Sequence, residues 1–227
     1  MQIKIAVASN IKFEHKTYPI VTASLIEQGI APDDIHFFSG GYPEYKYELR
    51  DGIHYHQLDH NSYEYSPLIE IVERQMESEY WFLVHDTCKF GSRFKELLYC
   101  IPNYKPLKMA IKTEPAMSIG TYRYDYLLSL KEKLLAIKNK DYSKDSMLFW
   151  KDWGRKFEDY ILWKTSPRPE VYNDDNRWAV TKYENWYDTP SIRRTEYYHS
   201  LDLYKNKSNW GQGLDLEKPF NVMMIDL

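Results

Sequence analysis

The residues with the clearest chemical potential are His85, Asp86 and Thr87, which end an apolar run at residues 80–84. An apolar run of this length predicts a buried strand. A carboxylate at the end of such a strand could hold a divalent cation, and that cation could neutralise a diphosphate. Aspartate also caps turns and helices, and this structural role competes with the chemical one on equal terms.

The hydrophobic pattern predicts the elements that must position this strand end. Apolar runs predict strands at residues 3–8, 35–38, 80–84 and 107–111, and alternation of apolar and polar residues predicts a half-buried strand at 53–58. Helical spacing predicts helices at residues 18–29, where Gly29 would form the C-terminal cap, and at 68–76, 94–101, 122–138 and 145–163. This alternation predicts an α/β fold with a mostly parallel central sheet and helices on both faces. Ligands of such sheets bind outside the carboxyl ends of the strands, here residues 9–10, 39–41, 59–62, 85–87 and 113–115.

The composition limits the functional classes. The chain has 227 residues, 43% of them hydrophobic, which suits one domain with a buried core. Its net charge of −3 disfavours a nucleic-acid partner, which needs a basic surface. Two cysteines are too few for a disulfide framework, and the spacing of His54, His56 and His60 matches no recognised zinc motif. No apolar run reaches the roughly 20 residues of a membrane span, so a cytoplasmic protein is expected.

The first 120 residues resemble a GT-A-fold glycosyltransferase. The resemblance lies in the order strand, Ser9-Asn10, helix, Gly-Ile-Ala-Pro-Asp-Asp-Ile turn, strand and Gly40-Gly41, together with Asn61-Ser62 and the His-Asp-Thr strand end. Within this family, the small domains that large algal (chlorella) viruses encode resemble this chain most in length and general sequence pattern. The sequence departs from the family in one respect, since it has one carboxylate where the family's Asp-x-Asp motif has two.

The resemblance implies a nucleotide-sugar donor, with UDP as the default nucleotide, and a glycan or glycoprotein acceptor. It assigns residues 1–115 to the donor-binding half of one domain and residues 116–227 to the acceptor side and a C-terminal wrap. A divalent cation, Mn²⁺ or Mg²⁺, would be held by Asp86 and His199. A virus-encoded enzyme would act in the host cytoplasm. The residues implied to contact the nucleotide are Ala8, Ser9, Asn10, Gly40, Gly41 and Asn61.

Two lysines near the carboxyl end of the chain could also reach the diphosphate. Lys205 and Lys207 lie in a polar stretch that runs into Trp210 and Gly211. A cation there would stabilise the departing nucleoside diphosphate, and the glycines would let this tail segment close over the substrate. The alternative is a solvated polar loop, which the residue types alone favour.

A transferase that inverts the sugar needs a general base for the acceptor hydroxyl, usually a carboxylate. Glu114 follows the fifth predicted strand and is well placed for this role. Asp125 lies at a predicted helix start, where capping is the alternative. Asp152 lies off the apolar stripe of its predicted helix, on the solvent side. A retaining enzyme would need no such base.

The aromatic content of 16% fits an acceptor groove in the last third of the chain. Beyond Pro167 the pattern is irregular and rich in aromatic residues, whose flat rings stack on sugars. The rings expected to line the groove are those of Tyr122, Tyr124, Tyr126, Trp178, Tyr183, Trp186, Tyr187, Tyr197, Tyr198, Tyr204 and Trp210. Two other functions stay open, namely a non-catalytic carbohydrate-binding module and another α/β nucleotide-dependent transferase. The chain has no glycine-rich dinucleotide or P-loop motif.

Overall fold

The computed structural model describes residues 1–100, 107–111, 114–138, 171–172, 179–180, 192–198, 201–208 and 223–224. Its main sheet has eight strands in the order β3-β4-β2-β1-β5-β8-β7-β9. The strands are β3 (Lys46–Arg50), β4 (Ile53–Leu58), β2 (Ile35–Gly40), β1 (Ile3–Asn10), β5 (Tyr80–His85), β8 (Glu114–Arg123), β7 (Leu107–Ile111) and β9 (Val171–Tyr172). The four central strands β4, β2, β1 and β5 are parallel to one another. The expected α/β class with a parallel central sheet is therefore confirmed.

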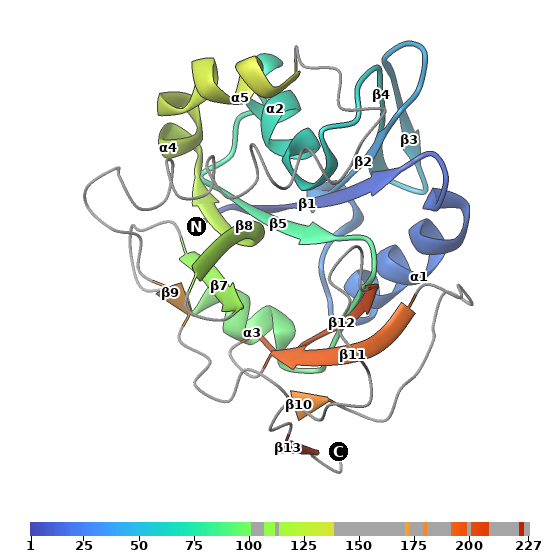
Figure 1. Ribbon diagram of the computed structural model, residues 1–227, viewed down its shortest axis with the longest axis vertical. Helices are drawn as coiled ribbons and strands as arrows, with labels where there is room; N and C mark the ends of the chain where they lie inside the picture. Colours follow the sequence, from blue (N-terminus) through green and yellow to red (C-terminus); the bar gives the residue numbers. More distant parts are fainter. Residues whose placement is uncertain are drawn as a thin grey trace.

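Helices cover both faces of this sheet, as the sequence predicts (Figure 1). One face packs against α1 (Glu14–Glu27) and α3 (Phe94–Tyr99), and the other against α2 (Ser66–Glu73), α4 (Tyr124–Ser129) and α5 (Lys131–Lys138). Side chains alternate along each strand, so Val7 and Phe82 enter the first core while Ala6 and Leu83 enter the second. Because both faces are covered there, the strands β1 and β5 have nearly continuous apolar runs.

One strand differs from the sequence expectation because local turn chemistry decides it. The strand β3 was not expected, since its five residues are charged or exposed. It forms a hairpin with β4 through Asp51 and Gly52, which both have positive φ, 51° and 82°. An Asp-Gly pair is the usual sequence of such a turn, so a signal for the hairpin was present. In α1, Gly29 has φ +79° just after the helix, which confirms its capping role.

The segment 114–138 corrects the expected helix at 122–138. Residues up to Arg123 form the strand β8, which pairs antiparallel with both β5 and β7. The helical part is split into α4 and α5 at Leu130. The predicted helix at residues 145–163 lies outside the described residues.

The C-terminal part contains a second, five-stranded sheet in the order β13-β10-β11-β12-β6. Its strands are β13 (Met223–Met224), β10 (Ala179–Val180), β11 (Ile192–Tyr198), β12 (Leu203–Ser208) and β6 (Cys88–Phe90). Tyr198, Leu201 and Leu203 join the same buried cluster as residues of α1 and α3. In place of the expected irregular wrap, residues 192–198 and 203–208 form a hairpin that packs on the core of the main sheet.

Candidate functional site

The candidate site lies between β1 and β5, where the order in which strands are added to the main sheet changes from one side of β1 to the other. From β1 the chain leads to β2 and β4 on one side, and it later returns to add β5 on the other side. The carboxyl ends of β1 and β5 lie together, because Ala8 is opposite His85 and the Asp86 amide donates a 3.0 Å hydrogen bond to the Ala8 carbonyl. Such a reversal point is where open α/β sheets bind ligands. Ser9, Asn10 and Asp86 are thus brought to one edge.

Asp86 is buried, with 8% of its surface exposed. The hydroxyl of Ser9 donates a 2.5 Å hydrogen bond to its Oδ2 atom, and the hydroxyl of Thr17 donates one of 2.7 Å to the same atom. Burial raises the pKa of the Asp86 carboxyl, while the two hydroxyls and the charge of Lys205 oppose that rise. Sequence reasoning missed Thr17, whose signal is a small hydroxyl residue on the sheet-facing side of α1.

Lys205 lies in a strand and not in the flexible tail that the sequence suggested. In β12 it is opposite Cys88 of β6, and the amide of the next residue, Asn206, donates a 2.9 Å hydrogen bond to the Thr87 carbonyl. Lys205 is only 6% exposed. Its positive charge lowers the pKa of both Asp86 and Glu64, so it lies within electrostatic range of the two carboxyls. The backbone of Lys207 lies opposite Arg194 in the same hairpin.

Glu64 is a second buried acid that sequence reasoning missed. It lies in the short 3₁₀ turn η2 (Tyr63–Tyr65), which packs against β1 and β8, and it is 5% exposed. Burial raises the pKa of its carboxyl to about 7, against a smaller lowering by its own backbone amide and Lys205. Its Oε1 atom has no hydrogen-bond partner among the residues the structure describes. Glu64 therefore titrates near neutral pH, unlike an ordinary carboxyl.

Gly40, Gly41 and Asn61 lie together at the ends of β2 and β4. A Cβ atom on Gly40 would lie 2.8 Å from the His60 carbonyl oxygen and 3.2 Å from the Asn61 Cα atom. Gly41 has φ +98°, and its amide donates to the carbonyls of Leu58 and His60. Both glycines thus have a structural reason to be glycine. Their contact with a nucleotide stays a prediction.

The structure separates the three candidate bases. Glu114 begins β8 next to the end of β7, which runs parallel to β5, so its backbone lies at the same edge as Asp86. Asp125 lies at the opposite edge, because Arg123 at the end of β8 is opposite Tyr80 at the start of β5. Asp152, like the predicted metal ligand His199, lies outside the described residues.

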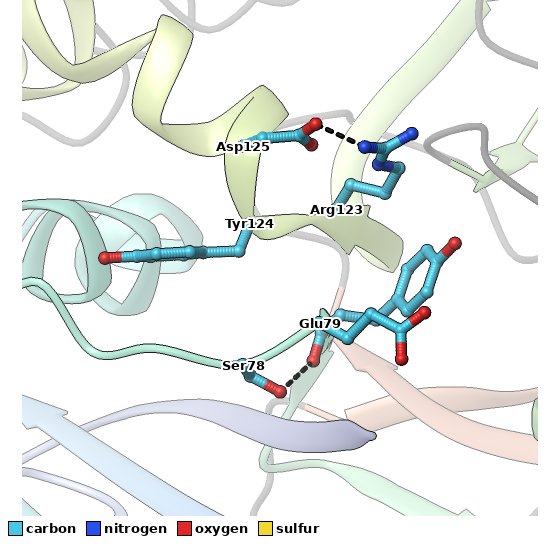
Figure 2. A pocket seen from close by; sticks show the side chains of 6 residues that line it. Ser78, Glu79, Arg123, Tyr124 and Asp125 are labelled. Atoms are coloured by element: carbon cyan, nitrogen blue, oxygen red, sulfur yellow. Dashed lines mark hydrogen bonds and ion pairs between the residues drawn. The ribbon is translucent and has the colours of Figure 1, made fainter. Parts of the chain in front are cut away.

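Asp125 is 65% exposed and forms an ion pair with Arg123 (Figure 2). Both residues line a hollow of about 270 Å³ together with Ser78, Glu79, Tyr80 and Tyr124. The whole length of β5 separates this hollow from Asp86. Asp125 therefore does not meet the other candidate residues among those the structure describes.

A separate group, Asp59, His60 and Glu70, brings three metal-ligand atoms within 4.8 Å of one another. Protein cations already neutralise it, since Lys138 lies 3.3 Å from Glu70 and 3.6 Å from Asp59, and Arg74 forms an ion pair with Glu70 at 2.5 Å. Burial alone would raise the pKa of the Glu70 carboxyl, but hydrogen bonds from His60 and Arg74 and the charge of Lys138 lower it well below its usual value. This group ties α5 to α2 as an ion-pair network.

The resemblance implies a divalent cation at Asp86, which would need several oxygen ligands. Among the described residues, no group of three ligand atoms includes Asp86. Its Oδ2 atom already accepts two hydroxyl hydrogen bonds, and the positive charge of Lys205 acts on it. The described residues around Asp86 thus do not fit a divalent cation by themselves.

The predicted aromatic groove is wrong for three of its rings. Tyr122, Tyr197 and Tyr198 are buried, and Tyr122 and Tyr198 belong to the cores on opposite faces of the sheet. Tyr124 and Tyr126 pack, partly buried, against the core under α2. Tyr204 is half-buried, and its ring centroid lies 4.6 Å from that of Tyr197. The remaining predicted rings lie outside the described residues: Trp178, Tyr183, Trp186, Tyr187 and Trp210.

Comparisons of the chain with models of protein families, with curated proteins and with solved structures found no match. Within the described part of the chain, no helix has the length and apolar character needed to cross a membrane.

Proposed function

We propose that the protein is a glycosyltransferase that moves a sugar from a nucleotide diphosphate sugar, by default a UDP-sugar, to a glycan or glycoprotein acceptor. One observation carries the proposal. The hydroxyls of Ser9 and Thr17 hold the buried Asp86 carboxylate where the carboxyl ends of β1 and β5 meet. This is the edge at which α/β sheets bind nucleotides, and the resemblance of residues 1–120 supplies the class of donor.

In this proposal the donor lies along the end of β1. Ala8, Ser9 and Asn10 contact the base and ribose through backbone groups and small polar side chains. The helix α1 begins four residues after β1 without a side-chain cap, so the partial positive charge of its N-terminus lies near this edge, beside the acidic Glu14 of its first turn. Lys12 and Lys16 in the same segment add positive charge for the diphosphate.

The acceptor approaches from the side of β7 and β8. Its hydroxyl oxygen attacks the anomeric carbon, and the bond from that carbon to the phosphate oxygen breaks with its electron pair leaving on the nucleoside diphosphate. In an inverting reaction a carboxylate takes the hydroxyl proton. Glu114 is the candidate whose backbone lies at the correct edge, and Asp152 is the alternative.

The proposal is tested by isothermal titration of the protein with UDP, GDP, dTDP and ATP, each with Mn²⁺ and with a chelator. We expect a nucleoside diphosphate, UDP first, to bind in preference to ATP. Binding of none of the diphosphates would contradict the proposal, and glycan binding without nucleotide binding would indicate a carbohydrate-binding module. Preference for ATP would indicate another nucleotide-dependent transferase. Binding only with Mn²⁺ would show that a divalent cation joins the site.

A further inference from the structure

Asp202 joins two parts of the chain that are more than 100 residues apart. It lies in the turn between β11 and β12, and its carbonyl accepts a 2.7 Å hydrogen bond from the Gly91 amide. Its carboxylate accepts a 2.9 Å hydrogen bond from the Arg93 amide and a 2.8 Å hydrogen bond from the Tyr197 hydroxyl. The two bonds from Gly91 and Arg93 fix the C-terminal hairpin to the segment between β6 and α3, and the bond from Tyr197 closes the turn within the hairpin.

Gly91 and Asp202, which we call the joint, pack too closely for a side chain at position 91. A Cβ atom on Gly91 would lie 2.2 Å from the Asp202 carboxyl carbon. Asp202 itself has φ +48°, a left-handed conformation that aspartate tolerates better than most residues. Figure 1 shows β11 and β12 beside each other, on the side of the main sheet that also carries α1 and α3. The absence of a side chain at Gly91 therefore permits the close approach of the Asp202 carboxylate.

The joint determines which residue of β12 reaches the Asp86 strand end. The strand β6 begins two residues after Asp86, and β12 pairs with it so that Leu203 is opposite Phe90 and Lys205 is opposite Cys88. A slip of one residue would turn every side chain of β12 to the other face. In the observed register Lys205 is buried and its charge acts on the carboxyls of Asp86 and Glu64.

We propose that Asp202 is a positioning residue, whose hydrogen bonds to the β6–α3 segment set the register of β12 and so hold the Lys205 ammonium at the Asp86 strand end. The role of that ammonium toward a donor diphosphate rests on the proposed function. The placement of Lys205 by Asp202 does not rest on it, and the two are tested separately.

The placement is tested by a double-mutant cycle with Asp202→Ala, Lys205→Met and the double variant. The readout is the pKa of Glu64, followed by NMR titration of the carboxyl carbon. Removing the lysine charge should raise this pKa by about 1. Asp202→Ala should raise it by a similar amount, and the double variant should add nothing further. An unchanged pKa in Asp202→Ala, or additive shifts in the double variant, would overturn the proposal.

Two further variants separate positioning from general loss of stability. Gly91→Ala should shift the pKa of Glu64 as Asp202→Ala does, because its Cβ displaces the same carboxyl. Leu25→Ala removes a buried side chain of α1 that has no part in the joint, so it should destabilise the protein without moving this pKa. A shift of the same size in Leu25→Ala would contradict a specific role of Asp202.

Nucleotide affinity provides the second arm of the test. If Lys205 meets the donor diphosphate, then Asp202→Ala and Lys205→Met should each weaken UDP binding about tenfold, and the double variant no further. If wild-type protein binds no nucleoside diphosphate, the proposed function fails, whereas the pKa cycle still decides whether Asp202 places Lys205.

Discussion

The Thr17 hydroxyl donates a 2.7 Å hydrogen bond to the carboxylate of Asp86, 69 residues further along the chain. This bond ties the first half of α1 to the end of β5, and the Ser9 hydroxyl bonds to the same carboxylate oxygen from β1. The strand β1, the helix α1 and the end of β5 thus meet at the buried carboxylate of Asp86. Because burial opposes ionisation of Asp86, each hydroxyl that stabilises the carboxylate contributes to both the site and the fold.

Thr17→Val should lower the free energy of unfolding by about 1–2 kcal/mol, because it removes a hydrogen bond to a buried acid without changing the side-chain shape. Urea unfolding monitored by circular dichroism measures the change. Thr22→Val is the matched control, since the Thr22 hydroxyl is also buried but bonds only to the Tyr18 carbonyl of its own helix. An equal loss in both variants would mean that the bond to Asp86 contributes nothing specific.

Glu64 should make the protein less stable as the pH rises. The pKa of its carboxyl is about 7 in the folded protein and 4.5 in an unperturbed glutamate, so the folded state binds more protons between these values. The free energy of unfolding should therefore fall from pH 4.5 to pH 7, by at most about 3 kcal/mol. Urea unfolding of Glu64→Gln at pH 5 and pH 8 should show a smaller fall than wild type. Glu96→Gln, a change on the exposed face of α3, should behave as wild type, and an identical pH dependence in all three proteins would refute the assignment.

Glu70 should have the opposite pH dependence. Its pKa is lowered in the folded state, so its contribution to stability is complete above pH 4.5 and is lost as the pH falls toward the lowered value. Glu70→Gln should reduce the free energy of unfolding at pH 7 by about 2 kcal/mol, because His60, Arg74 and Lys138 lose the negative charge they share and one of its two acceptor oxygens becomes a donor. The difference from wild type should shrink at pH 3. A difference that stays constant from pH 7 to pH 3 would show that the charge of Glu70 does not matter.

Gly91→Ala should lower the free energy of unfolding by about 2 kcal/mol, because its new Cβ atom would overlap the Asp202 carboxylate. The loss should be smaller in an Asp202→Ala background, where the carboxylate is absent. Thermal unfolding of the four proteins in this cycle measures the coupling. If Gly91→Ala lowered the free energy of unfolding equally in wild type and in Asp202→Ala, the overlap with the Asp202 carboxylate would not be the cause.

The main sheet was predictable because its central strands are buried on both faces. Residues 3–8, 35–38 and 80–84 are largely apolar runs of strand length, residues 53–58 alternate, and each matches a strand of the structure. The strand β3 was missed because it is an exposed edge strand without such a run, although Asp51-Gly52 marks its turn. The carboxyl-terminal hairpin was missed because its partner, β6, has only three residues and lies far away in sequence.

The candidate site was predictable only in part. Ser9 and Asp86 follow directly from the rule that strand ends of a parallel sheet meet. Thr17, Glu64 and the burial of Lys205 depend on which helix face, turn and hairpin register pack against that edge. These are tertiary contacts, which local sequence patterns do not encode. For the same reason Tyr122 was assigned to a groove although it is a core residue of a strand.

The central claim is that the Asp86 edge of the sheet binds a nucleoside diphosphate. Its most direct test is the dissociation constant for UDP of wild type, Asp86→Asn and Asp125→Asn, with calorimetry as the measurement. The two variants make the same chemical change at opposite edges of the sheet. We expect wild type to bind and Asp125→Asn to bind as wild type, whereas Asp86→Asn should bind at least about tenfold more weakly, because it loses the charge to which Ser9, Thr17 and Lys205 are oriented at this edge. Equal affinity of the Asp86→Asn variant and wild type would contradict the claim.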